Sequence, residues 1–130
     1  MKKSILLAFA WLVSVMAQAQ MMEPVKFSSR LKNLEKAEAE IVFSATIDDG
    51  WHVYSTELGN DGPISASLQV KSLDGVELVG KLRPRGKEIS EFDQMFGKKL
   101  RYFEKAATFV QRIRYTKPQY SIEVSLEYGA

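Results

Sequence analysis

Apolar and polar residues alternate with a period of two along most of the chain. Apolar side chains occupy every second position of 41–47 and of 122–128, and serine and glutamate fill most positions between them. In the segment 107–116, Phe109 and Ile113 fall on one side of an extended chain and two arginines on the other. Alternation at this period is typical of strands with one buried face. The pattern therefore predicts an all-β domain.

Turn-forming residues divide the alternating runs into short strands. Asp48-Asp49-Gly50 and Asp74-Gly75 are typical of tight turns, and Gly59–Pro63 of a longer loop. We expect seven or eight strands at the spacing of an immunoglobulin-like β-sandwich. They fall near residues 25–31, 39–47, 51–57, 66–73, 76–82, 98–104, 107–116 and 120–128.

Two segments lack a clear strand pattern. The charged, alanine-rich segment 32–40 fits either a helical turn or a surface loop that leads into a strand. The segment 90–96 is expected to form one helical turn with Ser90 as its N-cap. Apolar residues are unusual in a loop, so those in 92–97 are expected to cover either the end of the sandwich or a site.

The aromatic residue Trp51 begins the strand expected at 51–57. Strand tryptophans of such sandwiches pack in the core, and we expect Trp51 there. A carbohydrate-binding sandwich would instead use Trp51, Tyr54 and Tyr102 as stacking platforms.

The N-terminus has the pattern of a secretory signal peptide. Lys2 and Lys3 precede an apolar run of about 12 residues, which ends before the small-residue pattern Ala17-Gln18-Ala19. A membrane-spanning helix needs roughly 20 apolar residues. We predict a cleaved signal peptide over 1–19, one domain over 20–130, and a periplasmic location.

Removal of the signal peptide changes the charge balance. The chain has 18 basic and 16 acidic residues, and loss of Lys2 and Lys3 leaves 16 of each. A domain of zero net charge has no electrostatic reason to bind nucleic acid or anionic lipid. The chain has no cysteine, although disulfides persist in exported proteins, so its stability must come from its core.

Residue types that carry catalysis or bind metals are scarce. His52 is the only histidine, and nothing in the spacing brings it together with Ser55 or Ser65 and an aspartate as a triad. Zinc needs several cysteine or histidine ligands, and the aspartates are scattered among turns. We therefore predict no catalytic residue, no metal and no cofactor.

Basic residues alternate over one short segment. Lys81, Arg83, Arg85 and Lys87 would share one face of an extended chain, although Pro84 and Gly86 interrupt the run. The segment is either an anion-binding stripe or an edge strand guarded by charge, and we favour the edge strand.

Three segments that occur in order carry a family resemblance. They are Asp48-Asp49-Gly50-Trp51-His52-Val53-Tyr54-Ser55, Phe92-Asp93-Gln94-Met95-Phe96-Gly97-Lys98 and Leu126-Glu127-Tyr128-Gly129. The set resembles the N-terminal periplasmic domain of the thiol:disulfide interchange protein DsbD, and the free-standing exported disulfide bond corrector domains. The resemblance covers Pro24 to Ala130 and implies an immunoglobulin-like sandwich, in agreement with the strand pattern.

The resemblance also implies a capped site. In the family, a loop between strands covers a cysteine pair, and the matching cap here consists of Asp93, Gln94, Met95, Phe96 and Gly97. An aromatic residue of the cap limits oxidation of the sulfurs until a partner displaces it. Met95 stands where the family often has that aromatic residue, and Asp93 is expected to tune the pKa of a nearby thiol.

This sequence departs from the family in its sulfur content. The first family cysteine is expected immediately beyond Tyr128, Gly129 and Ala130, which would flank the site, but the chain stops there without a cysteine. The chain is either truncated just before the redox cysteines or a degenerate member retained for binding, and we favour truncation. Thiol–disulfide exchange needs an attacking thiolate and a resolving thiol, so the chain as given is expected to be redox-inactive.

Two functions follow from these expectations. The resemblance implies an electron relay between a membrane electron-donor domain and periplasmic thiol-redox proteins, with the enzymatic activity of a protein-disulfide reductase in the family. The cysteine-free chain at face value predicts a non-enzymatic binding or adaptor module that presents Phe92, Met95 and Phe96 to a partner protein.

Overall fold

The fold consists of strands and turns. The computed structural model describes residues 23–130 and has no helix among them, and the predicted signal peptide 1–19 lies outside the described residues. The nine strands are β1 (Val25–Asn33), β2 (Glu38–Ile47), β3 (Val53–Tyr54), β4 (Ser67–Asp74), β5 (Val76–Arg85), β6 (Ile89–Asp93), β7 (Lys98–Phe103), β8 (Ala106–Tyr115) and β9 (Ser121–Glu127). The predicted all-β sandwich is confirmed.

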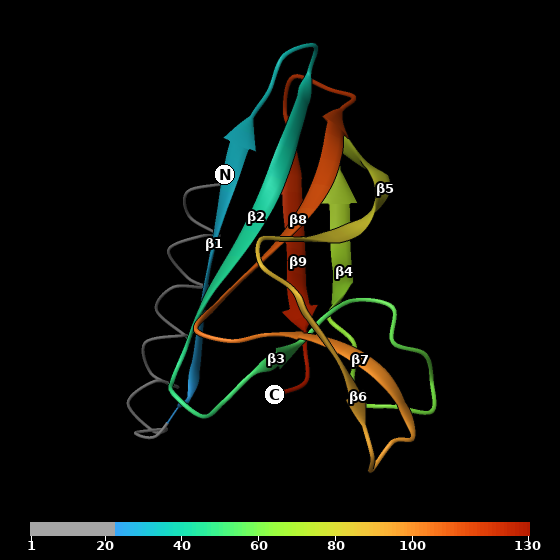
Figure 1. Ribbon diagram of the computed structural model, residues 1–130. Helices are drawn as coiled ribbons and strands as arrows, with labels where there is room; N and C mark the ends of the chain where they lie inside the picture. The colour runs from blue at the N-terminus through green and yellow to red at the C-terminus, as the bar shows by residue number, and fades with distance from the viewer. Residues whose placement is uncertain (1–22) are drawn as a thin grey trace.

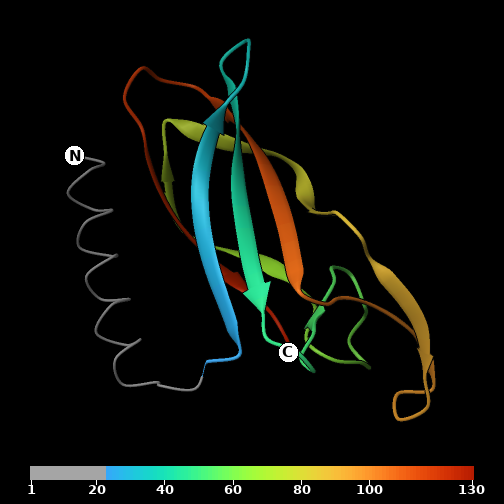
Figure 2. The same ribbon diagram turned by 60° about the vertical axis from the view of Figure 1, so that its left-hand side comes forward.

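The strands form three antiparallel sheets. The main sheet has the order β1-β2-β8-β5, the back sheet pairs β4 with β9, and the site sheet has the order β3-β7-β6. Figure 1 shows the back sheet behind the main sheet, so that these two make the sandwich. The β6–β7 hairpin of the site sheet projects beyond one end of the sandwich in both views (Figures 1 and 2).

The predicted alternation determines which side chains form the core. On β2, Ile41, Phe43, Ala45 and Ile47 are buried, while Glu40 and Ser44 on the opposite face are partly exposed. From the neighbouring strands, Phe109 and Ile113 of β8 join the same cluster, against which Ile122, Val124, Leu126 and Tyr128 pack. Burial of this apolar surface, at about 25 cal/mol per Å², is the main stabilising term in a chain without disulfides.

Strand β5 extends three residues beyond the expected range and contains a bulge. Its pairing with β8 is interrupted between Val79 and Arg83. The buried side chain of Gln111 fills the gap, and its Nε2 donates to the Gly80 carbonyl at 3.1 Å. Pro84 is tolerated because β5 is an edge strand, where a missing amide costs no ladder hydrogen bond.

Two turns decide local features that the sequence pattern left open or predicted differently. The segment between β1 and β2 is a tight surface turn, with Lys36 and Ala37 at positive φ, and no helical turn forms. The expectation that Trp51 packs in the core is wrong, because its side chain is 47% exposed. Gly50 at φ +84° and the hydrogen bond from the Trp51 amide to the Asp48 carbonyl keep Trp51 in the turn before β3.

Candidate functional site

The C-terminal end of the described chain is attached to the site sheet. The Tyr54 amide donates to the Gly129 carbonyl at 3.0 Å, and the Tyr128 ring packs on Phe27 with ring centres 4.7 Å apart. A Cβ atom on Gly129 would lie 2.7 Å from the Ile64 carbonyl oxygen, so this position accepts only glycine without movement. The three predicted flanking residues, Tyr128 to Ala130, therefore end beside β3.

An aromatic cluster lies next to this attachment point. Tyr54 and Tyr102 are opposite each other in the β3–β7 pair. The His52 ring lies 4.9 Å from the Tyr54 ring and 4.8 Å from the Tyr102 ring, centre to centre. The only histidine of the chain thus contacts two phenol rings, and sequence reasoning did not bring these three residues together as a site.

Carboxylates surround the two phenols. The Tyr102 hydroxyl donates to the Glu91 carboxylate at 3.4 Å. Burial, followed by the negative charges of Glu91 and Glu104, raises the pKa of Tyr102. Burial and the negative charge of Asp93 raise the pKa of Tyr54. Both phenols stay protonated well above neutral pH. The Tyr102 hydroxyl donates its proton to Glu91, so the Tyr54 hydroxyl is the one that can donate to a ligand.

The predicted cap, Asp93 to Gly97, forms the tip of the β6–β7 hairpin. The Asp93 carboxylate accepts a hydrogen bond from the Phe96 amide at 3.0 Å, and the Asp93 carbonyl accepts one from the Gly97 amide at 2.8 Å. The expected helical turn with Ser90 as N-cap is wrong. Ser90 lies within β6 opposite Arg101, and Asp93 provides the side-chain acceptor that closes the turn.

The hairpin tip is an exposed apolar surface. Met95 is 87% exposed and Phe92 59%, so Phe92 does not plug the end of the sandwich. Asp93 lies close enough to Tyr54 to act on its pKa, and Tyr54 is bonded to Gly129. No hydrogen bond or ion pair within residues 23–130 joins the hairpin tip directly to Tyr128, Gly129 or Ala130.

Two cations fix the loop after β3 against the site sheet. Lys98 Nζ donates to the Leu58 carbonyl and to the Asp61 carboxylate, both at 2.6 Å. On the same strand, Arg101 forms an ion pair with Glu88 at 3.0 Å and donates to the Thr56 carbonyl. Sequence reasoning missed both clamps, because strand register brings together residues about 40 positions apart.

The described residues offer no catalytic constellation. Ser55 is fully buried and its hydroxyl donates to the Glu88 carboxylate, while the Ser65 hydroxyl accepts from the Leu58 amide. Neither serine contacts His52, whose ring contacts are with tyrosines. Within residues 23–130, no group of three or more histidine, aspartate or glutamate side chains could hold a metal ion.

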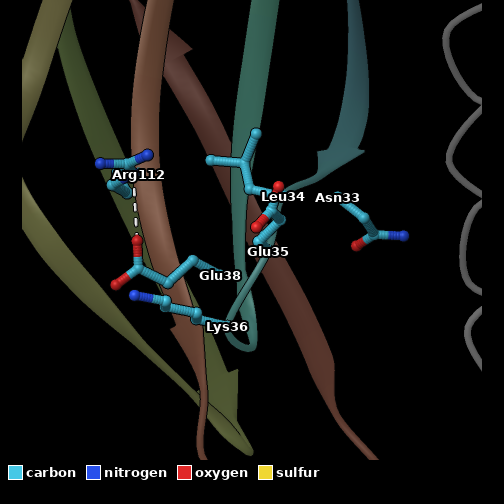
Figure 3. A pocket seen from close by; sticks show the side chains of 6 residues that line it. All are labelled: Asn33, Leu34, Glu35, Lys36, Glu38 and Arg112. Atoms are coloured by element: carbon cyan, nitrogen blue, oxygen red, sulfur yellow. Dashed lines mark ion pairs between the residues drawn. The ribbon is translucent and has the colours of Figure 1, made fainter.

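A separate pocket of about 710 Å³ lies at the β1–β2 turn. Its lining residues are Asn33, Leu34, Glu35, Lys36, Glu38 and Arg112. Figure 3 shows Arg112 facing Glu38, with 3.3 Å between the Arg112 Nε and Glu38 carboxylate atoms. The pocket is open and holds no nucleophile or histidine, and the C-terminal residues do not line it. The candidate site therefore remains the aromatic cluster with the hairpin tip.

Comparison with family models gives a match over most of the chain. The family model described as thiol:disulfide interchange protein DsbD, N-terminal, matches residues 18–130. The chain belongs to the DsbD N-terminal domain family. The comparisons with curated proteins and with solved structures gave no match.

Membership of the DsbD N-terminal family gives the candidate site a chemical setting. The family is named for thiol:disulfide interchange, so its partners are, in general terms, thiol-redox proteins, and its domain is periplasmic. The 130 residues of this member contain no cysteine. No helix in the described part of this DsbD N-terminal domain is long and apolar enough to span a membrane.

Proposed function

We propose that this domain serves thiol:disulfide interchange in the periplasm by docking thiol-redox proteins at the aromatic cluster and the hairpin tip. The match of the DsbD N-terminal family over residues 18–130 carries this proposal. The partners are periplasmic thiol-redox proteins and a membrane electron-donor domain, and the predicted signal peptide 1–19 exports the chain.

The sulfur atoms must come from outside these 130 residues, because none of them is cysteine. In the exchange, a thiolate attacks a partner disulfide, forms a mixed disulfide and releases one partner thiolate. A second thiol then resolves the mixed disulfide, so that the partner gains two electrons and the relay pair becomes a disulfide. The Tyr54–Gly129 hydrogen bond supports a location for such a pair just after Ala130, beside His52 and Tyr54.

The hairpin tip has two roles in this proposal. Met95 is flexible and apolar, and it shields sulfur atoms until a partner protein displaces it. The Asp93 carboxylate disfavours a nearby thiolate by like-charge repulsion, which raises the pKa of that thiol. Both roles keep the relay pair from reacting before a partner is docked.

A single introduced thiol tests this geometry. We expect the Cys side chain of Ala130→Cys to react with iodoacetamide several-fold faster when Met95→Ala is added, and its apparent pKa to fall when Asp93→Asn is added. Ser125→Cys, on the exposed face of β9, is the matched control and should respond to neither change. Equal responses of the two thiols would exclude a local cap.

Activity of the unaltered chain gives the second test. We expect no dithiol-dependent reduction of a disulfide substrate by the 130-residue chain. We expect activity from a variant to which a cysteine pair is added directly after Ala130. Turnover by the cysteine-free chain would overturn the proposal.

The exposed hairpin tip also favours a second candidate function, a non-enzymatic adaptor. Phe92 and Met95 are available to a partner without any thiol chemistry. Titration calorimetry with a purified periplasmic thiol-redox protein separates the two functions. The interchange function predicts different affinities for the oxidised and reduced partner, whereas an adaptor binds both forms equally. In either case, Met95→Ala should weaken binding.

A further inference from the structure

The charges of this neutral domain are unevenly distributed over its surface. Residues 23–130 contain 16 basic and 16 acidic side chains, because Lys2 and Lys3 are the only charged residues before them. The strand registers place seven basic side chains on the outer face of the main sheet, namely Lys26, Arg30, Lys32, Arg83, Arg85, Arg112 and Arg114. The same face has three acidic side chains, Glu38, Glu40 and Glu77, and hence a net charge of +4.

Two of the three carboxylates of this basic face lie deeper than the guanidinium groups that pair with them, and the third, Glu77, is as exposed as its partner Arg114, at 53% and 48%. The Glu40 side chain is 14% exposed, and its partner Arg85 is 56% exposed. The Glu38 side chain is 22% exposed, and its partner Arg112 is 49% exposed. At Glu38 and Glu40 the ion pairs therefore leave the arginines outermost, and an approaching molecule meets positive charge there first.

Other cations on the basic face have no acidic partner. Lys26, Arg30, Lys32 and Arg83 form no ion pair within the described residues. At the β5 bulge, a groove of about 330 Å³ is lined by four basic side chains, Lys81, Arg83, Arg85 and Arg112, with Glu40 as its acidic residue. The groove is large enough for a phosphate-bearing group.

The basic face exposes no large apolar side chain at its centre, unlike a protein–protein interface, because its outward valines Val42 and Val110 are only 2% and 6% exposed. The exposed large apolar residues of the described chain lie elsewhere, on turns, on the hairpin tip, on the back sheet, or on the inward-facing positions of β1 and β5. An anionic lipid surface requires only basic residues spread over an open face. We propose that the outer face of the main sheet docks on an anionic phospholipid surface.

This docking leaves the candidate site accessible. Figure 1 views the main sheet from the side opposite the back sheet, with the C-terminus and the β6–β7 hairpin at its lower end. A membrane against the outer face would contact β1, β2, β8 and β5. The aromatic cluster and the hairpin tip would remain at one end of the domain, where a partner can reach them.

Vesicle binding tests the proposal with the purified protein. The assay is co-sedimentation of the protein with phosphatidylglycerol/phosphatidylcholine vesicles and with phosphatidylcholine vesicles, at low salt and at 0.5 M salt. Binding is expected to the anionic vesicles at low salt and to weaken at 0.5 M salt. Each basic residue near an anionic surface contributes about fivefold in affinity. The double variant Arg30→Glu/Arg83→Glu should therefore lose roughly 25-fold or more. Both side chains are exposed and unpaired among the described residues, so the variant should unfold at the same denaturant concentration as wild type.

The matched control changes the same charge on the opposite side of the sandwich. Lys71→Glu/Lys117→Glu reverses two exposed lysines next to the back sheet and should bind anionic vesicles within twofold of wild type. Equal loss in the control, or equal binding to uncharged vesicles, would overturn the proposal. Displacement by inorganic phosphate at matched ionic strength would indicate a discrete oxyanion site instead. Tighter binding to duplex DNA or to an acidic protein than to vesicles would also overturn it.

Discussion

Replacement of Gly129 by alanine tests how the C-terminal residues are held beside the candidate site. The added Cβ atom would lie 2.7 Å from the Ile64 carbonyl oxygen and 3.2 Å from the Ile64 Cβ atom. Ordinary contact begins near 3.4 Å, so the backbone must move by at least about 0.7 Å, the difference from 2.7 Å. Because the obstacle is backbone, a change of side-chain rotamer cannot relieve the contact.

The expected cost follows from what this movement breaks. The Tyr54 amide is 3.0 Å from the Gly129 carbonyl, and a shift of this size loses most of that hydrogen bond, worth about 1 kcal/mol. Part of the packing of Tyr128 on Phe27 is lost as well. We expect the free energy of unfolding to fall by about 1–2 kcal/mol. We also expect the Tyr54 amide to exchange its hydrogen faster.

Urea unfolding and hydrogen exchange measure both effects. Gly62→Ala is the matched control, because the added Cβ atom there meets mainly the flexible Lys98 side chain, whose Cε is 3.1 Å away. We expect the control to change the free energy of unfolding by less than about 0.5 kcal/mol. If Gly129→Ala is as stable as the control and keeps the Tyr54 amide protected, the attachment described here is wrong.

Three further variants test the clamp, the tyrosines and the core. Lys98→Met should raise the pKa of Asp61 toward its ordinary value, because the hydrogen bond from Lys98 lowers it, and NMR titration measures this. Burial, followed by Tyr120, raises the pKa of Tyr115 to about 12. This raised pKa stabilises the fold below pH 10, and the stabilisation is lost as the pH rises to 12. We compare the free energy of unfolding in urea of wild type and Tyr115→Phe at pH 9 and at pH 12. The difference in favour of wild type should be smaller at pH 12 by about 2 kcal/mol. If this difference in the free energy of unfolding is the same at both pH values, the raised pKa of Tyr115 is contradicted. Phe103→Ala should cost about 3–5 kcal/mol in urea unfolding, because Phe103 is buried against Phe109, whereas a cost below 1 kcal/mol would refute that packing.

The sequence predicts the strands of the sandwich well where one face of a strand is exposed to solvent. Strands β2, β8 and β9 follow the period of two because water covers one side and the core the other, except that Val42 and Val110 are buried on the outward side. The pattern fails at the site sheet. Its strand β6 exposes nearly every residue, so no apolar period identifies it. Trp51 lies outside the core because β3 begins only at Val53, two residues after the start of the strand expected at 51–57.

The candidate site is predictable only in part. Asp93 to Gly97 and Tyr128 to Ala130 are expected from the family resemblance, and these two groups remain a proposal about cap and flank. The aromatic cluster of His52, Tyr54 and Tyr102 depends on the register of β3 against β7. Pairing between distant strands cannot be obtained from local spacing, and the same holds for the clamp formed by Lys98.

Net charge illustrates the same limit and connects the two proposals. A net charge of zero gives no reason to expect an anionic partner. Strand register nevertheless concentrates basic residues on one face of the domain. Carboxylates such as Glu91 and Asp93 lie instead around the phenols of the site. A domain held on an anionic lipid surface by its basic face would present that site at a fixed height. This arrangement raises the effective concentration of the site toward a membrane-embedded electron donor. In a form of the domain with a cysteine pair added after Ala130, the Arg30→Glu/Arg83→Glu change should then slow exchange with the membrane donor while leaving exchange with a free periplasmic partner unchanged, which separates orientation from chemistry.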